Sequence, residues 1–374
     1  MKLFIFHADA GAGHRTAAEA AAQAFLVSAA DGDTVEVFDA LAFTPAFFRA
    51  GYTQGYLFFI RTAPRLWGLF YWLFNLPALS GVVRFGRRMV NRLIARDLVR
   101  FVLAEQPDAI ICFHFFSAEV LAHLRRTEQY RGKLYCGITD FGLHRFWLNR
   151  GIDAYFVACE QTARELFAAG VAPAQVAVTG IPIGGQFSRR REPAAARAGR
   201  GLAPDSFTVL VASGGFGVGP LREIVRCLDR SALPLQLIIV CGHNKELARV
   251  FQAQKFRCRA AIFGYVTNMD ECMAAADLII SKSGGLTVSE ALSRSLPMFI
   301  IRPIPGQETR NAEILRACGA GARFGAPAAL IPAMERAVAD NACVLRSMRA
   351  QAGALSRPHA AQEICRWIRA QRSL

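Results

Sequence analysis

A histidine follows the first apolar segment of the chain, in a turn of small residues. The stretch KLFIFHA at 2–8 predicts a short buried strand, and DAGAG leads from it into HRTAAEAAAQAFLVSAA, an alanine-rich helix. Small residues at a helix start allow a ligand to approach free N–H groups and the positive end of the helix dipole. We interpret Gly13 and His14 as part of a polar-ligand site in which the imidazole acts as a general base. A plain turn with a surface histidine fits these residues equally well.

The spacing of this loop excludes two common phosphate-binding patterns. It matches neither G-x-G-x-x-G nor a loop ending in G-K-S or G-K-T. Two more glycine loops follow apolar stretches in the second half, VASGGFGVGPL at 211–221 and ISKSGGLTVSEA at 280–291. In the later loop, four residues are expected to open a helix and direct backbone amides at a diphosphate, namely Ser283, Gly284, Gly285 and Leu286.

Two acidic positions accompany the later loop. Glu290 lies one helical turn beyond Leu286, where its carboxylate could accept two hydrogen bonds from ribose hydroxyls. A solvated helix residue is the alternative, but the neighbouring serine–glycine loop favours the ligand. RPIPGQETRNA at 302–312 predicts a loop whose turn is fixed by prolines and a glycine. The amide of Gln307 beside the carboxylate of Glu308 suits sugar hydroxyls, and an ordinary polar loop fits equally well.

Short apolar runs alternate with helical patterns in both halves of the chain, which predicts a parallel sheet in each half. The fold class is therefore α/β, with two doubly wound domains facing a cleft at the carboxyl ends of their strands. We predict an N-terminal domain at 1–187, an exposed Arg-, Ala- and Pro-rich linker at 188–206 and a C-terminal domain at 207–353. A final helix within 354–374 is expected to pack back on the N-terminal domain.

The formal net charge is +15, with 39 arginines and five lysines. A nucleic acid, an anionic membrane or a phosphorylated substrate would suit this surplus. No nucleic acid is expected, because no aromatic–basic stacking platform or binding module is visible. The ten cysteines form no C-x-x-C pair, which favours free thiols in a reducing compartment. The N-terminal apolar run is too short for a signal peptide.

Residues 43–83 are rich in aromatic and aliphatic side chains. From Leu66 to Val83 there are eighteen residues without a charge, close to the length of a membrane-spanning helix, but glycine, asparagine and proline interrupt them. Trp67 and Trp72 are of the type that lies at a membrane interface. We interpret the segment as interfacial, dipping into one leaflet. A buried pair of core helices and a transmembrane span are the alternatives.

The next stretch predicts a basic amphipathic helix. Arginines recur every four residues at Arg84, Arg88, Arg92, Arg96 and Arg100, with Arg87 beside them. Phe85, Met89, Leu93 and Leu98 are expected to form its apolar face. Such a helix suits an anionic bilayer surface, although a solvated charged face is the alternative.

Taken together, the motifs resemble those of the bacterial processive diacylglycerol glycosyltransferases and the plant monogalactosyldiacylglycerol synthases. More distantly, the chain resembles the N-acetylglucosaminyltransferase that makes lipid II. The resemblance covers nearly the whole chain. It rests on GAGHRTAAEA, TDFGLHRFWLN, VTGIPIGGQF, VCGHNKEL, GYVTNMDECMAAADLIISKSGGLTVSEAL and PIPGQETRNAE, in this order.

The resemblance implies a GT-B fold and a UDP-sugar donor bound mostly by the C-terminal domain. Tyr265 and Val266 would flank the uracil, and Glu290 would bind the ribose. The diphosphate would lie on the loop that begins at Ser283, near Gly214 and Gly215, with help from Lys245 or Arg302. Gln307 and Glu308 would bind the sugar. No D-x-D metal motif is present, so we expect no metal and no cofactor, with the UDP-sugar as a substrate.

For the acceptor, the resemblance implies a lipid alcohol such as diacylglycerol. His14 would lie near its hydroxyl, with Asp140 as its partner, while His144 and Trp147 would line the entrance. Core packing is the alternative for Trp147. The protein would be cytoplasmic and peripheral on the inner face of the cell membrane. Two departures from the family pattern are Ala12, where a glycine is common, and His243, where many relatives have arginine.

Three other functions fit the sequence. These are a soluble or other-acceptor enzyme of the same architecture, such as an epimerase, a basic nucleic-acid binder, and a binding protein that retains UDP-sugar affinity without transfer. Binding to anionic liposomes would distinguish a membrane enzyme from a soluble one.

Overall fold

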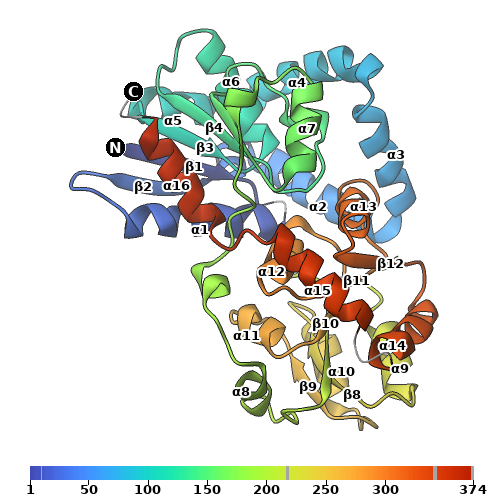
Figure 1. Ribbon diagram of the computed structural model, residues 1–374. Helices are drawn as coiled ribbons and strands as arrows, with labels where there is room; N and C mark the ends of the chain where they lie inside the picture. The colour runs from blue at the N-terminus through green and yellow to red at the C-terminus, as the bar shows by residue number, and fades with distance from the viewer. Residues whose placement is uncertain (10, 216–218, 340–342, 372–374) are drawn as a thin grey trace. The chain divides into compact units, whose positions relative to one another are not determined.

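The computed structural model describes residues 1–9, 11–215, 219–339 and 343–371. The chain forms two compact units. The first comprises Met1–Gly185, Pro305–Gln307 and His359–Leu374, and the second comprises Gln186–Ile304 and Glu308–Pro358. Each unit contains a six-stranded sheet whose strands are all parallel. The predicted α/β fold class is confirmed (Figure 1).

The first sheet has the strand order β2-β1-β3-β4-β5-β6. Its strands are β1 Lys2–His7, β2 Thr34–Asp39, β3 Ala109–Cys112, β4 Lys133–Gly137, β5 Ala154–Val157 and β6 Val176–Val178. Its helices are α1 Ala12–Val27, α2 Ala46–Thr62, α3 Pro64–Phe74, α4 Ser80–Ile94, α5 Arg96–Glu105, α6 Phe115–Arg126, α7 Glu160–Ala168 and α16 Ala360–Ala370. The strand order reverses between β1 and β3, and ligands of such sheets bind beyond the carboxyl ends of the strands at that point.

The second sheet has the order β12-β11-β10-β7-β8-β9 and reverses between β7 and β10. Its strands are β7 Phe207–Ala212, β8 Leu235–Val240, β9 Ala260–Phe263, β10 Leu278–Ser281, β11 Met298–Ile301 and β12 Gly321–Phe324. The accompanying helices are α8 Pro193–Ala198, α9 Leu221–Arg230, α10 Lys245–Ala253, α11 Met269–Ala274, α12 Gly285–Ser293, α13 Gln307–Ala317, α14 Leu330–Ala339 and α15 Cys343–Leu355. Both glycine loops of this half follow the two strands at the reversal.

Buried apolar strands explain why each sheet forms. The strand β8, LQLIIV, is buried at every position, as expected for a parallel strand covered on both faces. The sequence analysis did not identify β6 and β12. Both are very short, VAV and GARF, and neither is a continuous buried apolar run.

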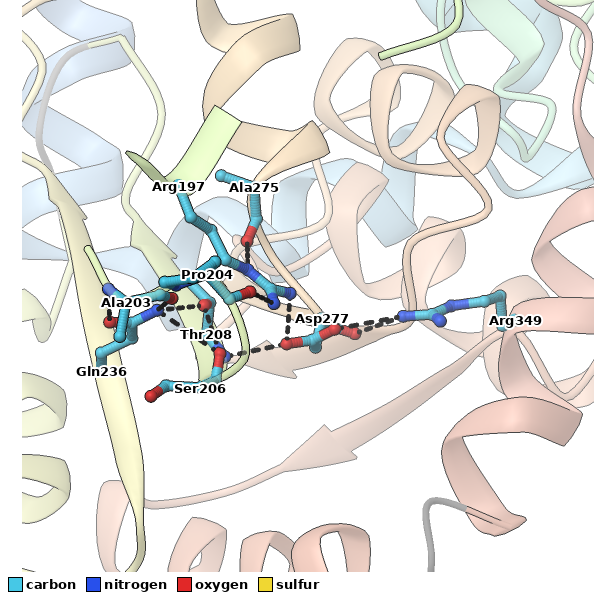
Figure 2. Close-up of polar contacts among 9 residues, drawn as sticks. All are labelled: Arg197, Ala203, Pro204, Ser206, Thr208, Gln236, Ala275, Asp277 and Arg349. Atoms are coloured by element: carbon cyan, nitrogen blue, oxygen red, sulfur yellow. Dashed lines mark hydrogen bonds and ion pairs between the residues drawn. The ribbon is translucent and has the colours of Figure 1, made fainter. Parts of the chain in front are cut away.

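The predicted linker at 188–206 is exposed over most of its length, but it belongs to the second unit, where three of its arginines form ion pairs. Arg197 is buried and donates to the carbonyls of Ala275 and Pro204 and to the carboxylate of Asp277 (Figure 2). The other two pairs are Arg191 with Asp270 and Arg200 with Glu271. The composition of the segment suggested a solvated chain, whereas its guanidinium groups anchor it to α11 and to the start of β10.

The last helix, α16, lies in the first unit and packs on α1. Its Arg369 donates to Asp33 at 2.8 Å, and Asp33 also accepts from the N-terminal ammonium group at 2.6 Å. The predicted final segment at 354–374 contains this helix. The predicted N-terminal boundary at 187 lies two residues beyond the observed end of the first unit at Gly185.

The prediction of one basic helix over 84–100 is wrong. The backbone leaves the helical conformation at Ala95, with φ −100° and ψ 17°, and so separates α4 from α5. Leu98 faces the core and is fully buried, because α5 packs its apolar side inward. Arg87 is not part of an exposed stripe either. Its guanidinium pairs with Glu119 and lies 3.8 Å from the ring centre of Phe146.

The outer residues of α4 nevertheless form an exposed apolar surface. Phe85, Met89 and Leu93 are half or more exposed, and Val82 and Val90 extend the same surface. We call these five residues the α4 apolar face. No residue of α3 is buried, so the alternative of a core helix pair at 43–83 does not hold. Within the described ranges, no helix has the length and apolar composition needed to cross a membrane.

Candidate functional site

The first unit brings His14 into a cluster of polar and aromatic groups at the strand-order reversal. His14 lies in the first turn of α1, whose N-cap Gly11 has no side-chain cap. Its Nδ1 is 2.8 Å from the hydroxyl oxygen of Thr139, which follows β4. The ring also hydrogen-bonds to the backbone carbonyl of Phe113. It packs edge to face on His114, with 4.9 Å between ring centres.

This environment keeps His14 uncharged. Burial lowers the pKa of His14 to about 4, the proximity of His7 acts in the same direction, and the hydrogen bond to Phe113 opposes them. The imidazole is therefore neutral near pH 7, the state in which a general base accepts a proton.

His7 and His114 were not singled out in the sequence. His7 ends β1 and is 7% exposed, and among the described residues its Nδ1 has no hydrogen-bond partner. His114 follows β3 and is 1% exposed, with Nδ1 accepting from the amide of Phe116. Burial lowers the pKa of both imidazoles. The sequence could have pointed to these histidines by their position. Each follows the carboxyl end of β1 or β3, the two strands between which the strand order reverses.

The other predicted acceptor residues also belong to the first unit. Thr139, the neighbour of Asp140, is the side chain in contact with Nδ1 of His14. Trp147 is 2% exposed and belongs to the core, as the packing alternative for it proposed, and its ring centre is 6.4 Å from that of His14. His144 is buried and its Nε2 is 3.2 Å from the carbonyl oxygen of Tyr71, which ties the following loop to α3.

The predicted interfacial residues differ in exposure. Trp72 is 59% exposed, whereas Trp67 is half-buried and packs against Tyr56. Arg92 is exposed, and Arg84 and Arg88 are half-buried.

The second unit places the later glycine loop at the N-terminus of α12. Gly284 is the N-cap of α12, and no side-chain hydrogen bond caps this helix among the residues that the structure describes, so its first N–H groups can donate to a ligand. The hydroxyl of Ser283 is buried and donates to the carbonyl of Glu308, while Asn311 donates to the carbonyl of Ser283. These two hydrogen bonds hold the loop before α12 against the first turns of α13. Gly285 and Leu286 form the first turn.

Glu290 lies one turn further along α12, as predicted. Its side chain is half-buried, and no hydrogen bond to its carboxylate is present within the described part of the chain. Burial raises the pKa of Glu290 to about 8, and the negative charge of Asp270 adds to this effect. Since the described residues donate no hydrogen bond to this carboxyl group, a ligand with hydroxyl groups could supply the missing donors.

The residues at 302–312 do not form the predicted loop throughout, because α13 begins at Gln307. Glu308 is 7% exposed and its Oε2 accepts from the amide of Ile304 at 2.7 Å. A Cβ atom on Gly284 would lie 3.7 Å from Oε1 of Glu308, so this carboxylate is next to the α12 loop. Burial raises the pKa of Glu308, and the positive charge of nearby Lys282 opposes the shift.

Gln307 belongs to the first unit. Its side-chain amide donates to the hydroxyl of Tyr56 at 3.4 Å.

The remaining donor-site positions border a pair of touching loops. Gly242 has φ +60°, and a Cβ there would lie 2.6 Å from the carbonyl oxygen of Gly215, so only glycine allows this approach. Gly214 also has positive φ. The ring of Tyr265 stacks on His243 at 4.3 Å, and Val266 follows it. Lys245 is exposed at the start of α10. Positions 216–218 of the predicted loop lie outside the described residues.

Comparisons with known proteins agree with this arrangement. The sequence profile of the monogalactosyldiacylglycerol (MGDG) synthase family matches residues 14–183, and that of the glycosyltransferase family 28 C-terminal domain matches 208–324. Over 274 residues, the chain is 33% identical to a processive diacylglycerol beta-glucosyltransferase of Staphylococcus saprophyticus. That alignment covers 72% of this chain and 68% of the relative. The chain is 35% identical to the processive diacylglycerol beta-glucosyltransferase of Staphylococcus haemolyticus over 219 residues. These residues cover 58% of this chain and only 55% of that relative.

Among solved structures, MurG of Acinetobacter baumannii superposes with a TM-score of 0.65 at 17% sequence identity, covering 98% of this chain and 99% of MurG. This likeness establishes the fold, which is the GT-B fold that the motifs implied. From the sequence matches, the chain belongs to the family of diacylglycerol glycosyltransferases that includes the processive diacylglycerol glucosyltransferases and the MGDG synthases.

Proposed function

We propose that the protein transfers a hexose from a UDP-sugar to diacylglycerol with inversion and so makes a membrane glycolipid. The observation that carries the proposal is the uncapped N-terminus of α12 with the carboxyl group of Glu290, which has no hydrogen-bond partner in the described part of the chain, one turn beyond it. Free amides suit a diphosphate, and a carboxyl group without partners in the protein suits ribose hydroxyls. The relatives' names, which specify diacylglycerol and glucose, support the acceptor and the class of sugar.

In the proposed donor complex, the diphosphate accepts from the first amides of α12, and Tyr265 and Val266 contact the uracil. Gln307 and Glu308 bind the sugar hydroxyls. As the glycosidic bond to UDP breaks, negative charge develops on the diphosphate, and the helix dipole and the side chains of Lys245 or Arg302 stabilise it. These groups provide the charge stabilisation that a metal ion supplies in other enzymes, so the proposed reaction is metal-independent.

In the proposed transfer, the neutral imidazole of His14 accepts the proton of the primary hydroxyl of diacylglycerol. The oxygen attacks the anomeric carbon while UDP departs from the opposite face, so an α-linked donor gives a β-glycoside. The low pKa of His14 keeps the imidazole uncharged across the physiological range.

We further propose that the protein binds peripherally to the inner face of an anionic membrane. The α4 apolar face and the exposed Trp72 would enter the headgroup region. Each arginine held near anionic lipid contributes on the order of 1 kcal/mol. The exposed Arg92, Arg96 and Arg100 are the candidates.

The test is an assay with diacylglycerol in mixed micelles and either UDP-glucose or UDP-galactose. We expect a β-linked glycosyl diacylglycerol with one of the donors, formed equally well in the presence of EDTA. His14→Gln should abolish transfer while UDP binding persists. His359→Gln, which alters an exposed histidine, is the matched control. Transfer by His14→Gln at the wild-type rate would exclude His14 as the base, and absence of product from both donors would contradict the proposed activity.

A further inference from the structure

A cavity opens at the amino ends of the strands of the second sheet, where β7 and β10 begin. Its volume is about 230 Å³. One water molecule needs only about 10–15 Å³ of such space, so the cavity can hold a small organic molecule. Phe207, the first residue of β7, and Asp277, which precedes β10, form one wall. The proposed donor site follows the carboxyl ends of these strands, so the two sites are at opposite edges of one sheet.

The carboxylate of Asp277 is already neutralised from within the protein. Its Oδ2 accepts from Arg197 at 2.8 Å and from the amide of Thr208 at 2.9 Å (Figure 2). Arg197 is 7% exposed and donates from its other nitrogens to two backbone carbonyls. The ion pair between the buried Arg197 and the half-buried Asp277 is therefore fixed in place and nearly neutral, and it lines the floor of the cavity.

The opposite wall, α15, carries two arginines, and among the described residues only one of them has a hydrogen-bond or ion-pair partner. The Nη2 atom of Arg349 is 3.7 Å from Oδ1 of Asp277 and 3.5 Å from its carbonyl oxygen, both at the limit of such contacts. Arg346 has no hydrogen-bond or ion-pair partner among the described residues. Positions 346 and 349 are three residues apart on one helix, so their side chains lie on the same face.

The charges that line the cavity are unbalanced. Arg197, Arg346 and Arg349 face only two carboxylates, those of Asp277 and Asp205, and Asp205 pairs with no arginine in the described part of the chain. Two like charges on one helix face repel each other unless an anion lies between them. A guanidinium group binds phosphate or carboxylate oxygens through two parallel hydrogen bonds. The cavity thus offers oxyanion donors that the protein itself does not occupy.

Apolar side chains complete the cavity. Leu345 is 2% exposed and Phe207 is half-buried, and both line the same space as the arginines. A ligand that fills the cavity would therefore combine an anionic group with a flat apolar body.

We propose that this cavity is a binding site for a small phosphate ester with an apolar substituent. Arg346 and Arg349 bind the phosphate, and Phe207 and Leu345 contact the substituent. The site is independent of UDP, because it lies at the amino edge of the sheet.

The experiment is a calorimetric titration of the full chain with phenyl phosphate, with and without saturating UDP, and a parallel titration with inorganic phosphate. We expect one phenyl phosphate per chain in both conditions, bound several-fold more tightly than inorganic phosphate. Arg346→Gln and Arg349→Gln should each weaken phenyl phosphate binding at least tenfold. Both side chains are exposed on α15, so the variants should fold.

Arg336→Gln is the matched control, because Arg336 is an exposed arginine of the neighbouring helix α14. It should bind phenyl phosphate like the wild type. Absence of binding by the wild type, or equal binding by the Arg346 and Arg349 variants, would overturn the proposal. Failure to bind UDP would instead count against the proposed function, since the arginine variants test the cavity separately.

Discussion

At the residue scale, the side chain that contacts Nδ1 of His14 is one that the sequence analysis did not name. The sequence analysis proposed Asp140 as the partner of the base, and the structure places the uncharged hydroxyl of Thr139 on Nδ1. A carboxylate partner would favour the imidazolium ion, whereas a hydroxyl orients the ring without that effect. We therefore propose that Thr139 orients His14, the proposed base, which remains neutral.

Replacing Thr139 by valine tests this role. Valine has nearly the same shape but leaves the buried Nδ1 without its hydroxyl partner. We expect kcat for glycosyl transfer to fall about tenfold to a hundredfold, with KM nearly unchanged. Thr139→Ser should restore most of the rate. Thr162→Val, which removes another buried hydroxyl of the first unit, should affect stability alone. Wild-type kcat in Thr139→Val would rule out the positioning role.

Glu290 gives a pH-dependent prediction. Burial raises its pKa to about 8 from an ordinary value of 4.5. Between these values the folded protein keeps a proton that the unfolded chain has released, so the free energy of unfolding falls as pH rises through this window and levels off above it.

Glu290→Gln removes this dependence. Urea unfolding at intervals from pH 5 to pH 9 should show the variant gaining stability relative to the wild type as pH rises. The matched control Glu335→Gln, at an exposed position of α14, should follow the wild type. Parallel pH profiles for the wild type and Glu290→Gln would contradict the assignment.

The glycine loops and Glu290 could be predicted from the sequence because each depends on local order, a strand followed by small residues and a helix. His7, His114 and Thr139 could not, because they come together only through the strand order β2-β1-β3-β4. That order depends on non-local packing, which a single sequence does not display.

At the element scale, periodicity identified most helices and strands but not where they end or what they face. The four-residue arginine repeat continues through 84–100, yet the helix ends at Ile94 because the apolar side of α5 turns into the core. The segment at 188–206 looked solvated because its arginines had no visible partners. Those partners, including Asp270 and Asp277, lie about eighty residues further on in the chain.

The α4 apolar face makes a prediction about membranes. Phe85→Ser combined with Leu93→Ser should reduce flotation with anionic vesicles at least fivefold, because both side chains are exposed and can contribute apolar contact to a bilayer. The melting temperature should change little, since neither side chain is buried. Val27→Ser, at an exposed apolar position at the end of α1, is the control. If the double variant floated with vesicles like the wild type, the proposed contact between α4 and the membrane would be excluded.

At the scale of the whole molecule, two features were visible before the structure. One is the repeated alternation of strand and helix patterns, which predicted two parallel sheets, and the other is the arginine-rich net charge of +15. The structure shows that many arginines are not free for a partner, since Arg87, Arg197 and Arg200 form internal ion pairs. Net charge alone therefore does not locate a surface for an anionic partner, because such a surface depends on which guanidinium groups remain unpaired.

The central claim is that the second unit holds a uridine diphosphate at the start of α12 with its ribose on Glu290. Calorimetric titration of the full chain with UDP tests it most directly. We predict one UDP per chain, at least tenfold weaker binding by Glu290→Ala, and wild-type affinity for Glu335→Ala. The claim would be contradicted if the wild-type chain did not bind UDP, or if Glu290→Ala bound it as tightly as the wild type.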